Sequence, residues 1–163
     1  MSRFLSCLTA AWVGTAILGQ AQAALPQHPD LDLAAAQRLA QAAPCSAALA
    51  VLDRSGQPIL LQRDTRVGPH NAEAARRKAF TALSTRTSSQ ALAERARQNP
   101  DAANLVTLPE LLLLGGGIPL YEGDQLVGAL GIAGAGGGGA DERCALAAAR
   151  HLALQSHPYR RIP

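Results

Sequence analysis

Aromatic residues are scarce in this chain, which has two Phe, two Tyr and one Trp among 163 residues. Surfaces that bind nucleic acids usually interleave aromatic side chains with a long basic stripe. Here the basic residues are scattered, apart from Arg76-Arg77-Lys78 and Arg160-Arg161. The sequence therefore gives no indication of a nucleic-acid partner.

Recognisable catalytic patterns are also missing. The sequence contains no nucleophile elbow, no Ser/His/Asp order, no zinc-ligand spacing and no paired carboxylates at expected buried positions. Lysine is almost absent, since Lys78 is the only one among 15 Lys and Arg residues. These absences favour a binding protein over an enzyme and leave enzymatic activity open.

The N-terminus has the three parts of a secretory signal peptide. Arg3 precedes an apolar run from Phe4 to Gly19, and the small-residue motif Ala21-Gln22-Ala23 follows it. The run of about 16 residues is shorter than the roughly 20 residues that cross a bilayer as a helix. We expect cleavage after Ala23, which makes residues 1–23 the signal peptide. The mature protein is then periplasmic or secreted and has no membrane segment.

The remaining chain has the usual length of one domain. Residues 24–30 form a short N-terminal lead and residues 158–163 a C-terminal tail. Cys7 is lost with the signal peptide, so the mature chain keeps Cys45 and Cys144. An oxidising compartment permits a disulfide between them. The alternative, that both are small buried hydrophobic residues, stays open.

Apolar periodicity and turn residues predict two β-hairpins separated and flanked by helices. Asp53-Arg54-Ser55-Gly56 is typical of a hairpin turn, and the preceding run 47–52 is apolar throughout, which predicts a central strand. The pattern is therefore α+β rather than alternating βαβ. The expected elements are a helix from Asp32 to Pro44 capped by Asp30 or Asp32, a hairpin over 47–63, a helix capped by Asn71, a helix over 89–98, an irregular segment to Pro109, a hairpin over 117–133, and a helix from Asp141 to Pro158.

The stretch "GIAGAGGGGADERC" contains Gly134, Gly136 and Gly139 in the spacing G-x-G-x-x-G. A dinucleotide site also needs a following parallel strand and an acidic residue about 20 positions further on. That position falls near Tyr159, close to the end of the chain. We therefore interpret the glycines as a flexible connection to the last helix, with a small carboxylate at the helix N-terminus as the weaker alternative.

Several motifs in order resemble the GlcG/HbpS family, also called haem-degrading or haem-binding domain proteins. They are "VLDRSGQPILLQR", "ARRKAFTA", "GGGIPLYEGDQLVGALGIAGA" and "ADE". The resemblance covers about Leu31 to Leu154 and places the domain at residues 31–157. It implies a profilin-like or PAS-like fold with a five-stranded antiparallel sheet and packed helices, and assembly into homo-oligomers. The chain departs from the family at Asp64-Thr65-Arg66, where Met-Asp-Gly is common.

Since some relatives bind haem, the resemblance implies haem as the cofactor, and His70 is the first candidate for its axial ligand and thus for metal binding. Lys78 and Arg77 are candidates for gripping a propionate or another carboxylate, with Thr81 beside them. The alternatives are a solvent-facing His70, a Glu73–Arg77 pair with Lys78 extending along the sheet edge, and a Thr81 hydroxyl bonded to the previous helical turn. Cys144 and His151 are too far apart along a helix to share one metal ion.

The leading hypothesis is an exported binding protein for a small-molecule ligand, with haem expected, that senses or sequesters it. A second hypothesis is an enzyme or accessory subunit that acts on a small carboxylate anchored by Lys78 and Arg77. A third is a stress-related oligomer whose assembly is its function.

Overall fold

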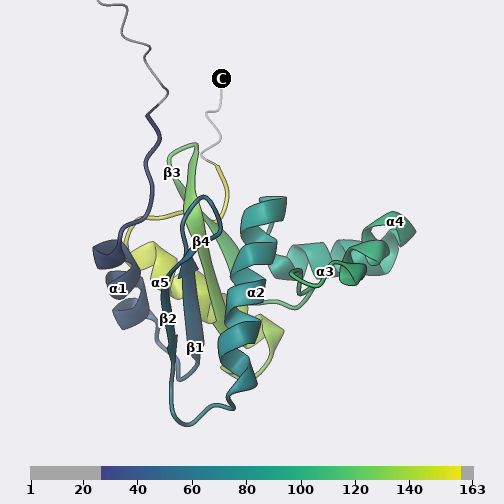
Figure 1. The fold of residues 1–163 in the computed structure, drawn as a ribbon, viewed down its shortest axis with the longest axis horizontal. Coiled ribbons are helices and arrows are strands. Elements are labelled where there is room, and N and C mark those ends of the chain that lie inside the picture. The colour runs from purple at the N-terminus through teal and green to yellow at the C-terminus, as the bar shows by residue number, and fades with distance from the viewer. Residues whose placement is uncertain (1–26, 159–163) are drawn as a thin grey trace, which may run out of the picture.

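The computed structural model describes residues 27–158, which form one α+β domain (Figure 1). The predicted signal peptide, the first residues of the lead and all of the tail except Pro158 lie outside the described residues. Within residues 27–158, no helix combines the length and the apolar character that crossing a bilayer requires.

A four-stranded antiparallel sheet with the order β2-β1-β4-β3 forms the centre of the domain. As predicted, β1 is a central strand, and all five of its residues are buried. Its apolar composition follows from this position, since helices cover the two faces of the sheet. The strands are β1 (Ala48–Leu52), β2 (Pro58–Arg63), β3 (Gly117–Glu122) and β4 (Gln125–Ala133).

Both predicted hairpins are confirmed. In the first turn, Asp53 Oδ1 accepts hydrogen bonds from the backbone N–H groups of Ser55 and Gln57, both at 2.8 Å. Gly56 follows with a φ of +83°, a left-handed conformation that favours glycine. Gly123, with a φ of +63°, does the same between β3 and β4.

The expectation of five strands is wrong for the described residues. Where a further strand could extend the sheet beyond β3, only one isolated bridge forms, between Tyr121 and Gln155. Ala153 turns the chain with a φ of +55° just before this bridge. Pro158 has no N–H to donate three residues after it. The segment that follows the last helix therefore pairs at a single position.

Two helices lie on one face of the sheet and one on the other, while a helical arm projects away from the domain (Figure 1). α1 and α5 cover the first face of the sheet, and α2 covers the second. The arm consists of α3, α4 and the 3₁₀ helix η1. The sequence predicted α3 as a helix and an irregular segment after it, where α4 and η1 form. The helices are α1 (Leu33–Ala42), α2 (His70–Thr85), α3 (Ser89–Gln98), α4 (Pro100–Ala103), η1 (Asn104–Thr107) and α5 (Gly138–His151).

The predicted start of α1 is confirmed, whereas α2 and α5 begin earlier than predicted. Asp32 caps α1 by accepting a hydrogen bond from Ala35 N at 2.7 Å, as expected. Asn71 does not cap α2, because the helix already begins at His70 and the Asn71 amide donates to Gly68 O. α5 begins at Gly138, three residues before the predicted start.

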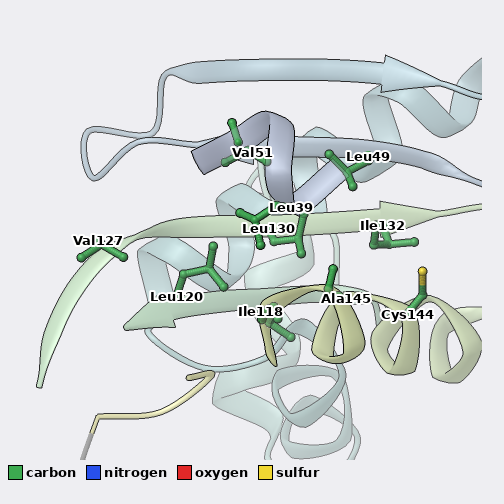
Figure 2. Close-up of a cluster of buried hydrophobic side chains, with 13 residues drawn as sticks. Leu39, Leu49, Val51, Ile118, Leu120, Val127, Leu130, Ile132, Cys144 and Ala145 are labelled. Carbon is green, nitrogen blue, oxygen red and sulfur yellow. The ribbon is translucent and has the colours of Figure 1, made fainter. Parts of the chain in front are cut away.

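The larger part of the core lies between the sheet and the pair α1 and α5. Figure 2 shows Leu39 of α1 and Ala145 of α5 packed against Leu49, Val51 and Leu130 of the central strands. These side chains are buried and come from segments far apart in the sequence. The burial of this apolar area is the main contribution to the stability of the domain.

The opposite face of the sheet has small residues at its contact with α2. Ala75 and Ala79 of α2 are fully buried there. A Cβ added to Gly131 would lie 2.0 Å from Ala75 O, and one added to Gly117 would lie 2.0 Å from Lys78 O. The helix backbone therefore rests directly on β3 and β4. This close approach places the α2 side chains against the sheet.

Candidate functional site

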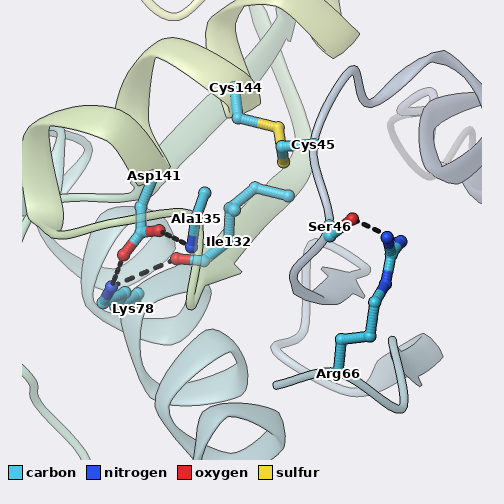
Figure 3. Close-up of a disulfide and its surroundings, with 8 residues drawn as sticks. All are labelled: Cys45, Ser46, Arg66, Lys78, Ile132, Ala135, Asp141 and Cys144. Atoms are coloured by element: carbon cyan, nitrogen blue, oxygen red, sulfur yellow. Dashed lines mark hydrogen bonds and ion pairs between the residues drawn. A yellow bond between two sulfur atoms is a disulfide. The ribbon is translucent and has the colours of Figure 1, made fainter.

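Lys78 of α2 is buried, with 1% of its surface exposed. Its Nζ lies 2.7 Å from Asp141 Oδ2 and donates a second hydrogen bond to Ile132 O at 3.1 Å (Figure 3). The other carboxylate oxygen of Asp141 accepts from Ala135 N at 2.7 Å. This arrangement satisfies both charged groups inside the protein and joins α2, β4 and α5.

The prediction that Lys78 extends along the sheet edge is wrong. Lys78 lies three residues after Ala75 and four before Ala82, so it shares their buried helical face. Asp141 has the same relation to Cys144 and the buried face of α5. Because the Lys78 ammonium group is inside the protein and paired, it is not placed to grip a ligand carboxylate.

Arg77 and Thr81 bind the segment that returns from the arm. The Arg77 guanidinium donates to Leu111 O at 2.8 Å. The Thr81 hydroxyl donates to Arg77 O at 2.7 Å, as the backbone-bonding interpretation predicted, and it accepts from Leu112 N at 2.8 Å. Both side chains therefore hold backbone groups of the chain itself.

The expected pair between Glu73 and Arg77 is replaced by a pair one residue earlier. Arg76 bonds Glu73 at 2.7 Å and also Glu110 of the returning segment at 2.7 Å. The hydrogen bonds from the Arg76 guanidinium lower the pKa of Glu73 below its ordinary value. Arg76 therefore ties the start of α2 to the base of the arm.

His70, the sequence-based candidate for an axial ligand, is the exposed first residue of α2. Lys78 points into the protein on the same helix, while Arg77 and Thr81 contact residues 111 and 112. The four candidates therefore do not converge on one pocket. His70 remains an accessible imidazole at a loop-to-helix junction.

The structure contains a disulfide between Cys45 and Cys144, whose Cα atoms are 6.3 Å apart (Figure 3). It links the segment before β1 to α5 across 99 residues of sequence. Cys144 therefore has no free thiolate for a metal. In the part of the chain that the structure describes, no group of three or more His, Cys, Asp or Glu side chains is placed to hold a metal ion.

The segment that departs from the resembled family forms a surface cluster beside the disulfide. The Arg66 guanidinium lies 2.6 Å from Asp64 Oδ2 and donates to the Ser46 hydroxyl at 2.5 Å. The hydrogen bonds from Arg66 hold the pKa of Asp64 well below its usual range. The local sequence change thus orders the loop between β2 and α2 by an exposed ion pair.

A groove of about 660 Å³ lies between α1, the C-terminal end of α5 and the hairpin of β3 and β4. Its residues belong to four separated segments of the chain, and no sequence motif marks them, so the groove could not be predicted from the sequence. Its apolar lining comprises Leu31, Ala35, Val127, Leu152, Ala153 and Leu154, and its polar lining comprises Asp30, Asp32, Arg38, Glu122, Arg150 and His151, with Pro29 at the edge.

A family model and solved structures match this chain, and they point to the same family. The family model described as "Haem degrading protein HbpS-like" matches residues 32–150. No curated protein matches the chain.

Solved structures agree with the family match. A crystal structure of HbpS is 37% identical, with 78% of this chain and 94% of that chain covered and a TM-score of 0.71. A double mutant of HbpS from Streptomyces reticuli is 35% identical, with 88% and 99% covered and a TM-score of 0.72. A PduOC haem complex is 22% identical, with 78% and 99% covered and a TM-score of 0.69, and shows the shared fold.

The family match spans most of the described domain, from the cap of α1 to the last turn of α5. The two HbpS structures extend the likeness over nearly the whole length of those chains. The chain therefore belongs to the HbpS-like family of haem-degrading proteins.

Proposed function

We propose that this protein is an exported, haem-binding member of its family that sequesters or senses haem. Membership of the HbpS-like family supports haem as the ligand, and the related PduOC fold has been solved as a haem complex. The proposal of export rests on the N-terminal sequence pattern. We also infer that the domain is a profilin-like or PAS-like variant with four strands.

The groove is the observation that carries the proposal, because its residues fit haem. Haem has an apolar macrocycle, two carboxylates and an iron that accepts an imidazole nitrogen. The groove offers six apolar side chains, two guanidinium groups and an imidazole, together with three carboxylates. Its volume of about 660 Å³ lies within the range of small-molecule sites, roughly 300–1,000 Å³. Bound haem would supply iron chemistry, while the chain would bind and orient it.

The alternative of a small-carboxylate enzyme loses Lys78 as an anchor, because Lys78 is paired with Asp141 inside the protein. Arg77 donates one hydrogen bond to Leu111 O, but it makes no ion pair within residues 27–158, and its buried Nε has no hydrogen-bond partner. This alternative therefore rests on Arg77 alone.

Titration with haemin tests the proposal directly. We expect residues 24–163 to bind haemin saturably at a stoichiometry near one per chain, with a sharp shift of the Soret band. The reason is that a protein ligand to iron changes the haem spectrum, whereas non-specific adsorption does not saturate. A linear, non-saturating response up to a large excess of haemin would contradict the proposal.

A second proposal, self-association, is favoured by apolar side chains on the arm. Val106 is 65% exposed and Leu108 is 50% exposed. Leu114 on the returning segment is exposed as well. Large apolar side chains that gather on an exposed surface are typical of protein contacts, and three of the five large exposed apolar residues within residues 27–158 lie between 106 and 114. We therefore propose that the protein forms homo-oligomers through the arm.

Light scattering tests this assembly. We expect the mature protein to have a mass that is a multiple of the monomer mass, and the double variant Val106→Asp, Leu108→Asp to shift toward the monomer. The matched control, the double variant Leu33→Asp, Leu61→Asp, places the same two charges at exposed leucines outside the arm. A monomeric wild-type protein at micromolar concentration would contradict the proposal.

A further inference from the structure

We infer that haem lies in the groove between α1 and the C-terminal end of α5, with His151 as the iron ligand and with Arg38 and Arg150 on the propionates. The inference rests on the proposed function, since it names the site of the same ligand. It replaces His70, the sequence-based candidate, which does not line this groove.

His151 lines the groove between its sequence neighbours Arg150 and Leu152, which line it as well. His151 is the last residue of α5 and is exposed. Leu152 and Leu154 follow it and line the same groove. An imidazole beside apolar side chains suits haem, because the macrocycle is apolar and imidazole nitrogen is a common ligand of haem iron.

The two arginines are available for carboxylates. Neither Arg38 nor Arg150 forms an ion pair with a carboxylate of residues 27–158. Arginine binds carboxylates with two parallel hydrogen bonds, and such charge-assisted bonds are stronger than neutral ones. Arg38 comes from α1 and Arg150 from α5, so the two guanidinium groups reach the groove from different helices.

Three carboxylates also line the groove, and two of them are engaged by backbone groups. Asp32 Oδ1 accepts from Ala35 N at the start of α1. Asp30 Oδ1 accepts from Leu31 N at 2.9 Å and from Arg54 N at 3.1 Å. Glu122 makes no ion pair within the described residues. All three charges oppose an anionic ligand, and Glu122 can be neutralised without losing a backbone hydrogen bond, so Glu122→Gln should strengthen binding.

The floor of the groove is apolar and firmly held. Val127 of β4 is 3% exposed and belongs to the main core cluster. Leu31 packs against that cluster, and its N–H donates to Val127 O at 3.2 Å. The backbone bridge between Tyr121 and Gln155 fixes the segment that carries Leu152 and Leu154 next to β3. A planar apolar ligand would therefore meet a surface that is already formed.

The first experiment compares haemin binding by the full mature chain and two histidine variants. We expect His151→Ala to abolish the Soret shift of the wild type or to weaken haemin binding by at least about tenfold, because the iron loses its protein ligand. His70→Ala is the matched control, since it also removes an exposed imidazole, at the first residue of α2 and outside the groove, and it should bind haemin like the wild type.

The second experiment uses iron-free protoporphyrin IX, whose fluorescence reports binding without iron ligation. We expect Arg38→Ala and Arg150→Ala each to weaken its binding by about tenfold, the scale of losing one charge-assisted hydrogen bond. Glu122→Gln should strengthen it, and His151→Ala should leave it within about twofold of the wild type. Circular dichroism checks that each variant keeps its fold, which is expected because these side chains are exposed.

The outcomes separate the site from the function. A His151→Ala variant with the haemin affinity and the Soret shift of the wild type, or the loss of haemin binding in His70→Ala, overturns the groove assignment and leaves the proposed function standing. Protoporphyrin binding that is unaffected by both arginine variants overturns the propionate assignment. Failure of the wild type to bind haemin saturably overturns the proposed function and the site together.

Discussion

Replacing Lys78 by Met is expected to destabilise the fold by about 3–5 kcal/mol, the usual result of removing one partner of a buried ion pair. The Asp141 carboxylate would keep its hydrogen bond from Ala135 N but would lose its counter-charge in a site with 3% of the side chain exposed. Urea unfolding followed by circular dichroism measures the change in the free energy of unfolding.

Two further variants make this prediction specific. The double variant Lys78→Met, Asp141→Leu should recover much of the lost stability, because an apolar pair of similar volume leaves no charge unpaired. Arg66→Met breaks an exposed ion pair with Asp64 and should change stability by no more than about 1 kcal/mol. A Lys78→Met variant as stable as Arg66→Met would show that the buried pair is not needed by the fold.

Removing the disulfide is expected to have an effect of similar size. In the loop-entropy description, a crosslink that closes a loop of about 100 residues stabilises a protein by about 4.7 kcal/mol, and measured losses are typically about 2–5 kcal/mol. Cys45 and Cys144 are separated by 99 residues. The double variant Cys45→Ala, Cys144→Ala should therefore have a lower urea midpoint than the oxidised wild-type protein.

Reductant provides the matched control for this prediction. Dithiothreitol should lower the urea midpoint of the wild-type protein to near that of the double variant, and it should leave the midpoint of the double variant unchanged. Thiol counting by mass spectrometry after alkylation reports whether the bond is present. An oxidised wild-type protein with the same midpoint as the double variant would contradict the prediction.

The Lys78–Asp141 ion pair and the Cys45–Cys144 disulfide both involve α5. Asp141 and Cys144 lie one turn apart on α5, so the ion pair holds this helix to α2 and the disulfide holds it to the segment before β1 (Figure 3). Neighbouring interactions that position one element are usually not additive. The charge and the crosslink therefore both fix the N-terminal half of α5.

Local patterns in the sequence determined most of the secondary structure. The turn Asp53 to Gly56 and the apolar run of β1 predicted the first hairpin and its central strand, and Asp32 predicted the cap of α1. These features depend on neighbouring residues only, which is why they can be read from a single sequence. The fifth strand was implied by the family resemblance, whereas residues 27–158 contain four strands and one isolated bridge between Tyr121 and Gln155.

The tertiary structure decided the roles of the candidate residues. The spacing of Ala75, Lys78 and Ala82 already places Lys78 on a buried face, but its partner Asp141 is 63 residues away. Cys45 and Cys144 could be named as a possible pair, whereas their bond depends on where α5 lies. A buried charge needs a partner in space, and sequence spacing beyond one helix does not specify distance.

The groove is the clearest case of a feature that only the fold creates. Arg38, Val127 and His151 belong to α1, β4 and α5, and no local pattern relates them. The sequence by itself determined the elements, their order and the apolar faces that bury them. The helices and the sheet are arranged so that their apolar faces are buried, because this burial is the main driving force of folding. That arrangement encloses some polar side chains, such as Lys78, and leaves others together at a surface groove.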